Sequence, residues 1–281
     1  MASHRYVVAD VFTDTPLTGN QLAVFTDARE LDDATMQALA LEIGFSETVF
    51  VLPPAEGGHA RIRIFTPVTE LPFAGHPTLG TAFVLGAPLQ LATIQLEMVA
   101  GIVPVVLERD ELGKIVFGWM TQPVPRVSDV PSPDVVLDAL GVERSVVPLE
   151  LYDNGVRHLF VGLEREEDVA ALRPDLRALA QYDVVGCNCF AGSGGRWKTR
   201  MFSPPYGVGE DAATGSAAGP LACHLARHGL IAWGDEIEIS QGAEIGRPST
   251  LYARADGADG LIDRVEVGGS AVIVARGEFR L

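Results

Sequence analysis

Four polar residues have the types and surroundings that acid/base chemistry on a small molecule requires. Glu47 starts an apolar segment, Thr48–Leu52, whereas His76, Asp211 and Ser216 lie at or near the starts of two expected helices. Each residue also has a plain structural explanation: an exposed strand end for Glu47, helix caps for His76 and Ser216, and a loop acid or helix-dipole partner for Asp211. Because they gather around two similar helix starts, we interpret them as one candidate site.

Those helix starts belong to a passage that occurs twice. The segment Arg63–Pro67 returns as Arg200–Pro204 roughly half a chain later, which is the pattern that a duplicated and fused domain leaves. In both copies a glutamate stands five residues before the glycine that opens a helix rich in small residues, and these pairs are Glu70 with Gly75 and Glu210 with Gly215. If the two halves pack face to face, two helix N-termini converge on one cleft, which suits a small anion.

Composition disfavours several function classes. The 281 residues are many for one core and 47% of them are apolar, so we expect two globular lobes. With 37 acidic and 21 basic residues the formal net charge is −16, and such a surface repels nucleic acid and anionic membranes. A small anionic substrate would therefore be held by local dipoles. The two lysines, Lys114 and Lys198, lie in no motif for a Schiff base to pyridoxal phosphate.

The absence of recognisable targeting and redox motifs in the sequence predicts a cytoplasmic protein. Residues 1–10 lead directly into a strand-like segment without the layout of a signal peptide, and no apolar run reaches transmembrane length. The cysteines Cys187, Cys189 and Cys223 lack zinc-ligand or redox spacing. We interpret them as small buried hydrophobic residues in a reducing compartment.

No metal or cofactor is predicted. A nucleophile elbow, a phosphate-binding loop with lysine and a dinucleotide fingerprint are all missing from the sequence. His224 and His228 stand four residues apart on an expected helix, but they lack a third ligand and a carboxylate pattern nearby. We interpret them as helix surface and helix C-terminus.

The first lobe, residues 1–125, is expected to consist mainly of strands. The strand-like segments are 5–12, 21–27, 47–53, 60–67, a hairpin over 93–109 that turns near Gly101, and 114–124. A helix capped by Asp32 or Asp33 should end at Gly44, and a second, apolar on nearly all sides and hence buried, should run from His76 to Gly86. The proline-rich stretch 123–133 is the expected linker.

The second lobe, residues 126–265, repeats this order. Strands are expected at 146–153, 157–163, 184–191 and 197–203, helices at 166–181 and from Ser216 to His228, and strands again over 236–281. For residues 266–281, a return of the terminal strands to the first lobe is an open alternative. The expected fold class is α+β, with each lobe an antiparallel, barrel-like sheet around one buried helix. A doubly wound parallel sheet is disfavoured because the connections are short.

Several motifs resemble the signatures of the PhzF-type phenazine biosynthesis isomerases. They are the long run Arg200–Leu221 and the shorter Gly19-Asn20, Ser46-Glu47, Phe73–Pro77, Asn154–His158 and Gln241–Pro248. The similarity extends over essentially the whole chain. It implies a diaminopimelate-epimerase-like fold, in which two pseudo-symmetric lobes have the site between them, and relatives imply a homodimer.

The resemblance also implies an activity. The family's reaction is a cofactor-independent isomerisation of trans-2,3-dihydro-3-hydroxyanthranilic acid, in which a proton moves along the ring to give an aminoketone. The catalytic residues fall on Glu47, as the acid/base, and on His76 and Asp211. Substrate binding falls on Ser216 and on the backbone N–H groups of Gly75 and Gly215.

One departure separates this chain from the cysteine-dependent epimerases of the same fold. Those enzymes place a thiol before each glycine, whereas here Ala74 and Thr214 stand there. Inverting a carbon requires a group on each face, but moving a proton along one face of a ring requires one base, which matches Glu47. Gln21 replaces a proline of many relatives and affects only a turn. Two alternatives stay open: an isomerase of another small amino or hydroxy acid, and a binding protein without chemistry.

Overall fold

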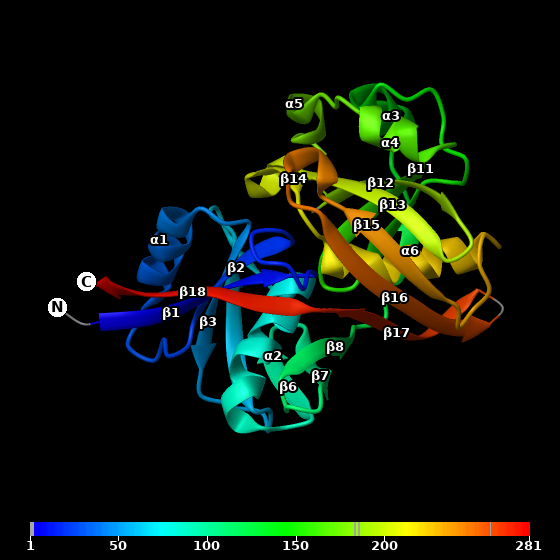
Figure 1. The fold of residues 1–281 in the computed structure, drawn as a ribbon. Helices are drawn as coiled ribbons and strands as arrows, with labels where there is room; N and C mark the ends of the chain where they lie inside the picture. The colour runs from blue at the N-terminus through cyan, green and yellow to red at the C-terminus, as the bar shows by residue number, and fades with distance from the viewer. Residues whose placement is uncertain (1–2, 183, 185, 259) are drawn as a thin grey trace. The chain divides into compact units, whose positions relative to one another are not determined.

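The computed structural model describes residues 3–182, 184, 186–258 and 260–281, which form two compact units. Unit 1 comprises Met1–Thr121 with Gly268–Leu281, and unit 2 comprises Gln122–Val267. Both units combine helices with a larger number of strands, so the fold class is α+β (Figure 1). Among the described residues, no helix combines the length and apolar character that crossing a membrane would take.

Unit 1 is a mixed sheet with a buried helix against it. Its strands are β1 (Ser3–Val11), β2 (Asn20–Phe25), β3 (Glu47–Leu52), β4 (Ala60–Phe65), β5 (Glu70–Leu71), β6 (Thr93–Met98), β7 (Gly101–Arg109), β8 (Ile115–Thr121) and β18 (Ala271–Arg280). β18 pairs with β1, so the end of the chain lies beside its beginning (Figure 1). Pairing continues from β1 through β2, β3 and β4 to β6, β7 and β8. Helix α2 (Gly75–Leu89) contacts β1, β2, β3, β6, β7, β8 and β18. Residues 75–84 of this helix are all buried, so this part of it is apolar on nearly all sides.

Unit 2 has a similar order of strands, with additional short helices. Its strands are β9 (Arg126–Asp129), β10 (Glu150–Asp153), β11 (Arg157–Gly162), β12 (Gly186–Ser193), β13 (Arg196–Ser203), β14 (Val208–Asp211), β15 (Glu236–Gln241), β16 (Ser249–Ala258) and β17 (Leu261–Gly269). Pairing runs from β9 through β10, β11, β12 and β13 to β15 and β16. Helix α6 (Gly215–Arg227) contacts β11, β15 and β16. The remaining helices are α3 (Pro133–Leu140), α4 (Glu166–Ala171), α5 (Leu176–Leu179) and the turns η1 (Pro204–Tyr206) and η2 (Ala243–Ile245).

The repeated sequence passage forms the same ion pair in each unit. Arg63 donates from Nε and Nη2 to the Glu70 carboxylate at 2.8 and 2.6 Å, and Arg200 donates in the same way to Glu210 at 2.8 and 2.7 Å. Bidentate pairs of this kind have a fixed geometry. They attach β4 to β5 and β13 to β14, directly before the two helices that open with glycine. The repeated arginine and glutamate therefore have a structural role, because they join neighbouring strands.

Within the described residues, the expectation of an antiparallel sheet in each lobe is wrong at four strand pairs. The parallel pairs are β2 with β3, β4 with β6, β11 with β12, and β13 with β15. In each case a helix lies between the two strands in the chain, and such a crossover is what allows neighbouring strands to run in the same direction.

The first expected helix is confirmed, but the second ends later than expected. Helix α1 spans Asp33–Ile43, with Asp32 accepting from the Thr35 N–H at 2.8 Å and Gly44 in the left-handed region. Helix α2 passes Gly86 and continues to Leu89. A Cβ on Gly86 would lie 2.4 Å from Leu107 Cδ1, so this glycine allows close packing rather than ending the helix.

One expected helix of the second lobe is wrong, and two elements there were not expected. The region 166–181 contains two short helices, α4 and α5, because Pro174 interrupts the helical pattern. The expected linker 123–133 includes strand β9, and α3 was not foreseen. The expected strands over 184–191 and 236–281 include residues 185 and 259, which lie outside the described residues.

Candidate active site

Glu47 and His76 lie next to each other in unit 1. Glu47 is the first residue of β3, three residues after the turn at Gly44 that ends α1, and His76 is the second residue of α2. Glu47 Oε2 lies 3.4 Å from His76 Nε2, and the two side chains are 14% and 3% exposed. Glu47 is therefore not an exposed strand end. Its Oε2 atom is buried and faces the imidazole.

His76 is a neutral imidazole and not a helix cap. Burial lowers its pKa to about 3, although a backbone hydrogen bond with Gln21 acts in the opposite direction. The N-cap residue of α2 is Ala74, and no side chain caps the helix. His76 Nδ1 lies 3.2 Å from Asn20 Nδ2, and Ser46 Oγ donates to Asn20 Oδ1 at 3.2 Å. Asn20 thus connects the imidazole to the residue before the candidate base.

In unit 2, Asp211 is held against the start of α6. Thr214, the N-cap residue of α6, donates its hydroxyl to Asp211 Oδ2 at 2.7 Å. Gln241 Nε2 donates to the Asp211 carbonyl and to Thr214 Oγ1, both at 2.9 Å, while Gln241 Oε1 accepts from the Thr214 N–H at 3.2 Å. Asp211 is buried, with 5% of the residue exposed, and its carboxylate is held by the Thr214 hydroxyl, so it is not a loose loop acid.

Ser216 bonds to a buried histidine and does not cap its own helix. His158 Nε2 lies 3.0 Å from Ser216 Oγ. On the other side of the ring, Asn188 Nδ2 lies 3.4 Å from His158 Nδ1 and donates to the carbonyls of Leu159 and Gly186 at 3.2 and 3.1 Å. The two carbonyls fix the orientation of the amide, because its oxygen cannot face them. His158 Nδ1 therefore faces a donor and carries no hydrogen.

This arrangement decides the direction of the bond to Ser216. Burial lowers the pKa of His158 to about 3, so the ring is neutral and carries its one hydrogen on Nε2. His158 consequently donates to Ser216 Oγ, and the hydroxyl retains its own hydrogen for a different acceptor. The same geometry opposes a serine nucleophile, because a histidine that donates to a serine cannot remove its proton.

Gly75 and Gly215 open α2 and α6, and no side chain caps either helix. The first backbone N–H groups of a helix have no partner within it, and together with the helix dipole they attract an anion. Each helix start also carries a polar residue of the candidate site at its second position, His76 or Ser216.

The six predicted site residues thus occur as two sets. Unit 1 holds Gly75 with Glu47 and His76, and unit 2 holds Asp211 with Gly215 and Ser216. Sequence reasoning assigned no role to the polar residues that position them, which are Asn20, His158, Asn188 and Gln241. A signal existed, because Asn188 and His158 interrupt apolar strands, and a buried polar side chain requires a partner.

The interpretation of His224 as helix surface is wrong. Its side chain is fully buried, and Glu150 lies beside it and beside His228. The three cysteines are buried and free, as expected, and burial raises the pKa of Cys223 to about 12.

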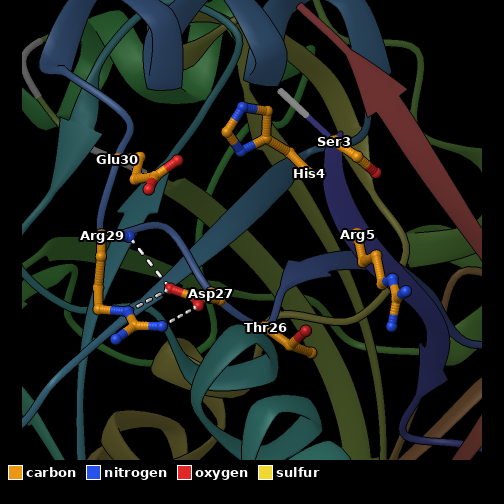
Figure 2. Close-up of a pocket in the computed structure, with 7 residues that line it drawn as sticks. All are labelled: Ser3, His4, Arg5, Thr26, Asp27, Arg29 and Glu30. Atoms are coloured by element: carbon orange, nitrogen blue, oxygen red, sulfur yellow. Dashed lines mark hydrogen bonds and ion pairs between the residues drawn. The ribbon is translucent and has the colours of Figure 1, made fainter. Parts of the chain in front are cut away.

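A pocket in unit 1 contains none of the candidate residues. Its lining residues are Ser3, His4, Arg5, Thr26, Asp27, Arg29 and Glu30 (Figure 2). The Arg29 and Asp27 side chains form an ion pair at 2.6 Å and are 66% and 55% exposed. An exposed pair of this kind contributes little to binding or stability, so we assign this pocket no function.

Comparison with known proteins identifies the family of this chain. The family of phenazine biosynthesis-like proteins, PhzC-PhzF, matches residues 9–277. The chain belongs to this family. A PhzC-PhzF relative from Pseudomonas aeruginosa, named trans-2,3-dihydro-3-hydroxyanthranilate isomerase, is 54% identical over 99% of this chain and 100% of its own length.

Solved structures show the same fold. A PhzF-family phenazine biosynthesis protein from Bacillus anthracis has a TM-score of 0.85 and 25% identity, with 100% of both chains covered. A hydroxyproline epimerase from Agrobacterium vitis has a TM-score of 0.69 and 13% identity, covering 98% of this chain and 92% of its own. At that identity the epimerase shares the fold alone.

Proposed function

We propose that this chain is a trans-2,3-dihydro-3-hydroxyanthranilate isomerase of phenazine biosynthesis. Support comes from a full-length relative of that name at 54% identity. The observation that carries the proposal at the level of residues is the contact of 3.4 Å between Glu47 and His76. It combines one largely buried carboxyl with one buried, neutral imidazole beside a helix start.

In the proposed reaction, Glu47 moves one proton along one face of the substrate ring. The carboxylate removes the proton from C3 and returns it at a distant ring carbon, which gives an enol that tautomerises to an aminoketone. The carboxylate is regenerated, so no other acid or base and no cofactor is required for the proton balance. A neutral His76 can hydrogen-bond the polar ring substituents without adding a charge beside the base.

Asp211, Ser216 and the two helix starts are proposed to hold the substrate. The Asp211 carboxylate accepts from the amino group, which is cationic when protonated. The substrate carboxylate accepts from Ser216 and from the backbone N–H groups at Gly75 and Gly215, and each helix start contributes about 0.3–1 kcal/mol. Local donors of this kind offset the repulsion from a chain with a net charge of −16.

We further propose that the two units are pseudo-symmetric lobes from one duplicated domain, and that both residue sets serve the same substrate molecule. The repeated arginine–glutamate pair and the shared order of strand pairing support the duplication. We also propose a cytoplasmic homodimer, which light scattering after size exclusion tests by its mass.

The decisive variant is Glu47→Gln. The amide keeps the shape of the side chain but cannot carry the proton, so we expect turnover to fall by at least about 10²-fold. Substrate binding should persist. The measurement is the ultraviolet spectrum during incubation with the dihydro-hydroxyanthranilate, together with calorimetric binding to the variant.

Glu42→Gln is the matched control, because Glu42 is exposed in α1 and lies outside both residue sets. It should retain wild-type turnover. Full activity of Glu47→Gln would remove Glu47 from the mechanism. If the wild-type protein binds the dihydro-hydroxyanthranilate but does not convert it, the chain is a binding protein without chemistry. If it neither binds nor converts this compound, an isomerase of another small amino or hydroxy acid is favoured.

A further inference from the structure

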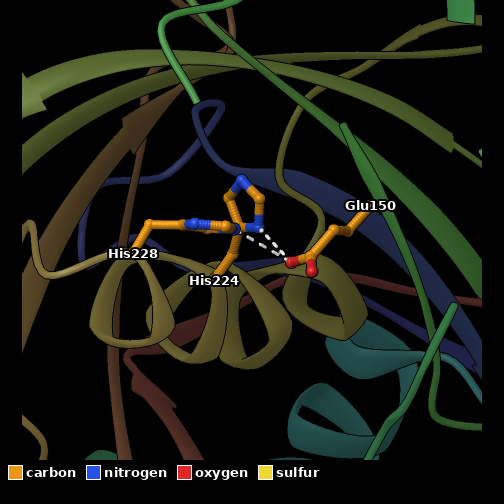
Figure 3. Close-up of side chains that lie close together, drawn as sticks. All are labelled: Glu150, His224 and His228. Carbon is orange, nitrogen blue, oxygen red and sulfur yellow. Dashed lines mark hydrogen bonds and ion pairs between the residues drawn. The ribbon is translucent and has the colours of Figure 1, made fainter. Parts of the chain in front are cut away.

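Three side chains that commonly bind metals meet in unit 2, at the end of α6 opposite Ser216. Glu150 is the first residue of β10, and His224 and His228 lie one helical turn apart (Figure 3). His228 Nε2 and His224 Nδ1 lie 3.0 and 3.3 Å from the same carboxylate oxygen, Glu150 Oε2. All three atoms are within 4.8 Å of one another. Two imidazoles and one carboxylate are a frequent protein ligand set for zinc.

Aromatic packing fixes His224 in this position. Its ring stacks on Phe160 with centroids 5.5 Å apart, and Phe190 and Tyr152 meet it edge-on at 5.7 and 5.5 Å. Tyr152 Oη also lies 2.9 Å from Glu150 Oε2 and 3.2 Å from His224 Nδ1. The buried half of the cluster is therefore preorganised.

The spacing of the donor atoms suits a tetrahedral ion. Zinc bonds of about 2.0–2.1 Å place neighbouring ligand atoms about 3.3 Å apart. The two distances to Glu150 Oε2, 3.0 and 3.3 Å, are close to that value. His228 follows the last residue of α6 and its side chain is 20% exposed, so it can adjust to complete the site and leaves a path for the ion.

Arg227 is the feature that opposes a cation here. Its Nη2 lies 3.3 Å from Glu150 Oε1, while its Nη1 donates to the Gly260 carbonyl at 2.7 Å. The guanidinium thus contacts the carboxylate oxygen that does not face the histidines, and its side chain is 24% exposed. It lowers the affinity for a cation without occupying the position that the histidines share.

We propose that Glu150, His224 and His228 bind one Zn²⁺ ion that joins β10 to the end of α6. The ion has a structural role, because it holds the far end of the helix that presents Ser216. The sequence-based expectation of no metal at these histidines rested on the lack of a third ligand and of a nearby carboxylate pattern. Glu150 is 74 residues from His224 in the chain, and only folding brings them together.

Metal titration of the full-length, tag-free protein after treatment with a chelator tests this proposal. We expect one equivalent of Zn²⁺ to bind by calorimetry and to raise the midpoint of thermal unfolding. Co²⁺ as a probe should give the intense visible bands of a tetrahedral site. His228→Gln and Glu150→Gln should each weaken binding at least about 100-fold, because even changes outside the ligand set cost roughly 10–100-fold.

Two exposed residues provide matched controls, His59→Gln for an imidazole and Glu164→Gln for a carboxylate, and both should bind like wild type. No stoichiometric binding by wild type, or unchanged affinity in His228→Gln, would overturn the proposal. If Glu150→Gln does not fold, His228→Gln decides alone, since its side chain is only partly buried. Arg227→Gln should tighten binding by removing the competing charge, and weaker binding there would contradict the assigned geometry.

Discussion

His158 acts on the candidate site through Ser216, because one hydrogen on a buried ring sets the direction of a hydrogen bond. Asn188 leaves Nδ1 without a hydrogen, so Nε2–H donates to Ser216 Oγ at 3.0 Å. The serine is then free to donate to the substrate. His158 is a positioning residue in this scheme and does not touch the substrate.

The first residue-scale prediction concerns substrate affinity. Ser216→Ala should raise KM by about 10- to 150-fold with little change in kcat, since one hydrogen bond to a bound anion contributes roughly 1.5–3 kcal/mol. His158→Phe keeps a ring without the donor and should raise KM by a smaller factor. The measurement is steady-state kinetics of both variants and of the double variant.

The double variant separates positioning from a general structural effect. If His158 acts through Ser216, the double variant should have the KM of Ser216→Ala, because the two residues share one interaction. If the KM increase of the double variant equals the product of the two single-variant increases, His158 acts elsewhere.

At the scale of elements, the loop after Glu47's strand depends on a carboxylate from another strand. Glu97 in β6 accepts from the backbone N–H groups of Ala55, Glu56 and Gly58 at 2.6, 2.7 and 2.7 Å. Burial raises the pKa of Glu97, but these three bonds outweigh burial and leave the pKa below its ordinary value. The ionised carboxylate therefore holds the β3–β4 loop.

Glu97→Gln should lower the free energy of unfolding at pH 7, because the amide places a donor against the loop N–H groups. Because the pKa of Glu97 is lower in the folded protein, its carboxylate stabilises the fold fully at pH values above the ordinary pKa of 4.5. This stabilisation is lost as the pH falls through the pKa of the folded state. The difference from wild type should consequently shrink in acid. Urea unfolding at several pH values measures it, with exposed Glu56→Gln as the control, and a difference independent of pH would contradict this role.

For the whole molecule, each unit contains one buried, neutral histidine of the candidate site. Burial lowers the pKa of His76 and of His158 from 6.5 to about 3. Below pH 6.5 the unfolded chain binds protons that the folded chain does not, so acid reduces stability. Above pH 6.5 these histidines do not reduce the free energy of unfolding. Below pH 6.5 they reduce it progressively until the pH approaches 3.

We therefore expect the free energy of unfolding to fall between pH 6.5 and 5, before most carboxylates titrate. Each such histidine contributes up to about 1.4 kcal/mol per pH unit to the slope of the free energy of unfolding against pH. His158→Phe should reduce the slope by up to that amount, as followed by denaturant unfolding across this pH range. An unchanged slope would show that His158 is charged in the folded protein.

Features that depend on near neighbours in the chain were predictable from the sequence. Asp32 and Gly44 bound α1 because a cap bonds residues within one turn. The repeat located both helices that open with glycine, and the resemblance of its motifs selected Glu47, His76, Asp211 and Ser216. The length of α2 was not predictable, because Gly86 is there for packing against Leu107.

The partners of these residues depend on folding. Four parallel strand pairs arise from crossovers that no local pattern encodes. His158 meets Ser216 across 58 residues of chain, and Glu150 meets His228 across 78. Hydropathy marks such residues only as polar within apolar surroundings. Tertiary packing decides which atom forms a hydrogen bond with each of these side chains. A buried polar group requires such a partner, and the folded backbone determines which groups lie within reach.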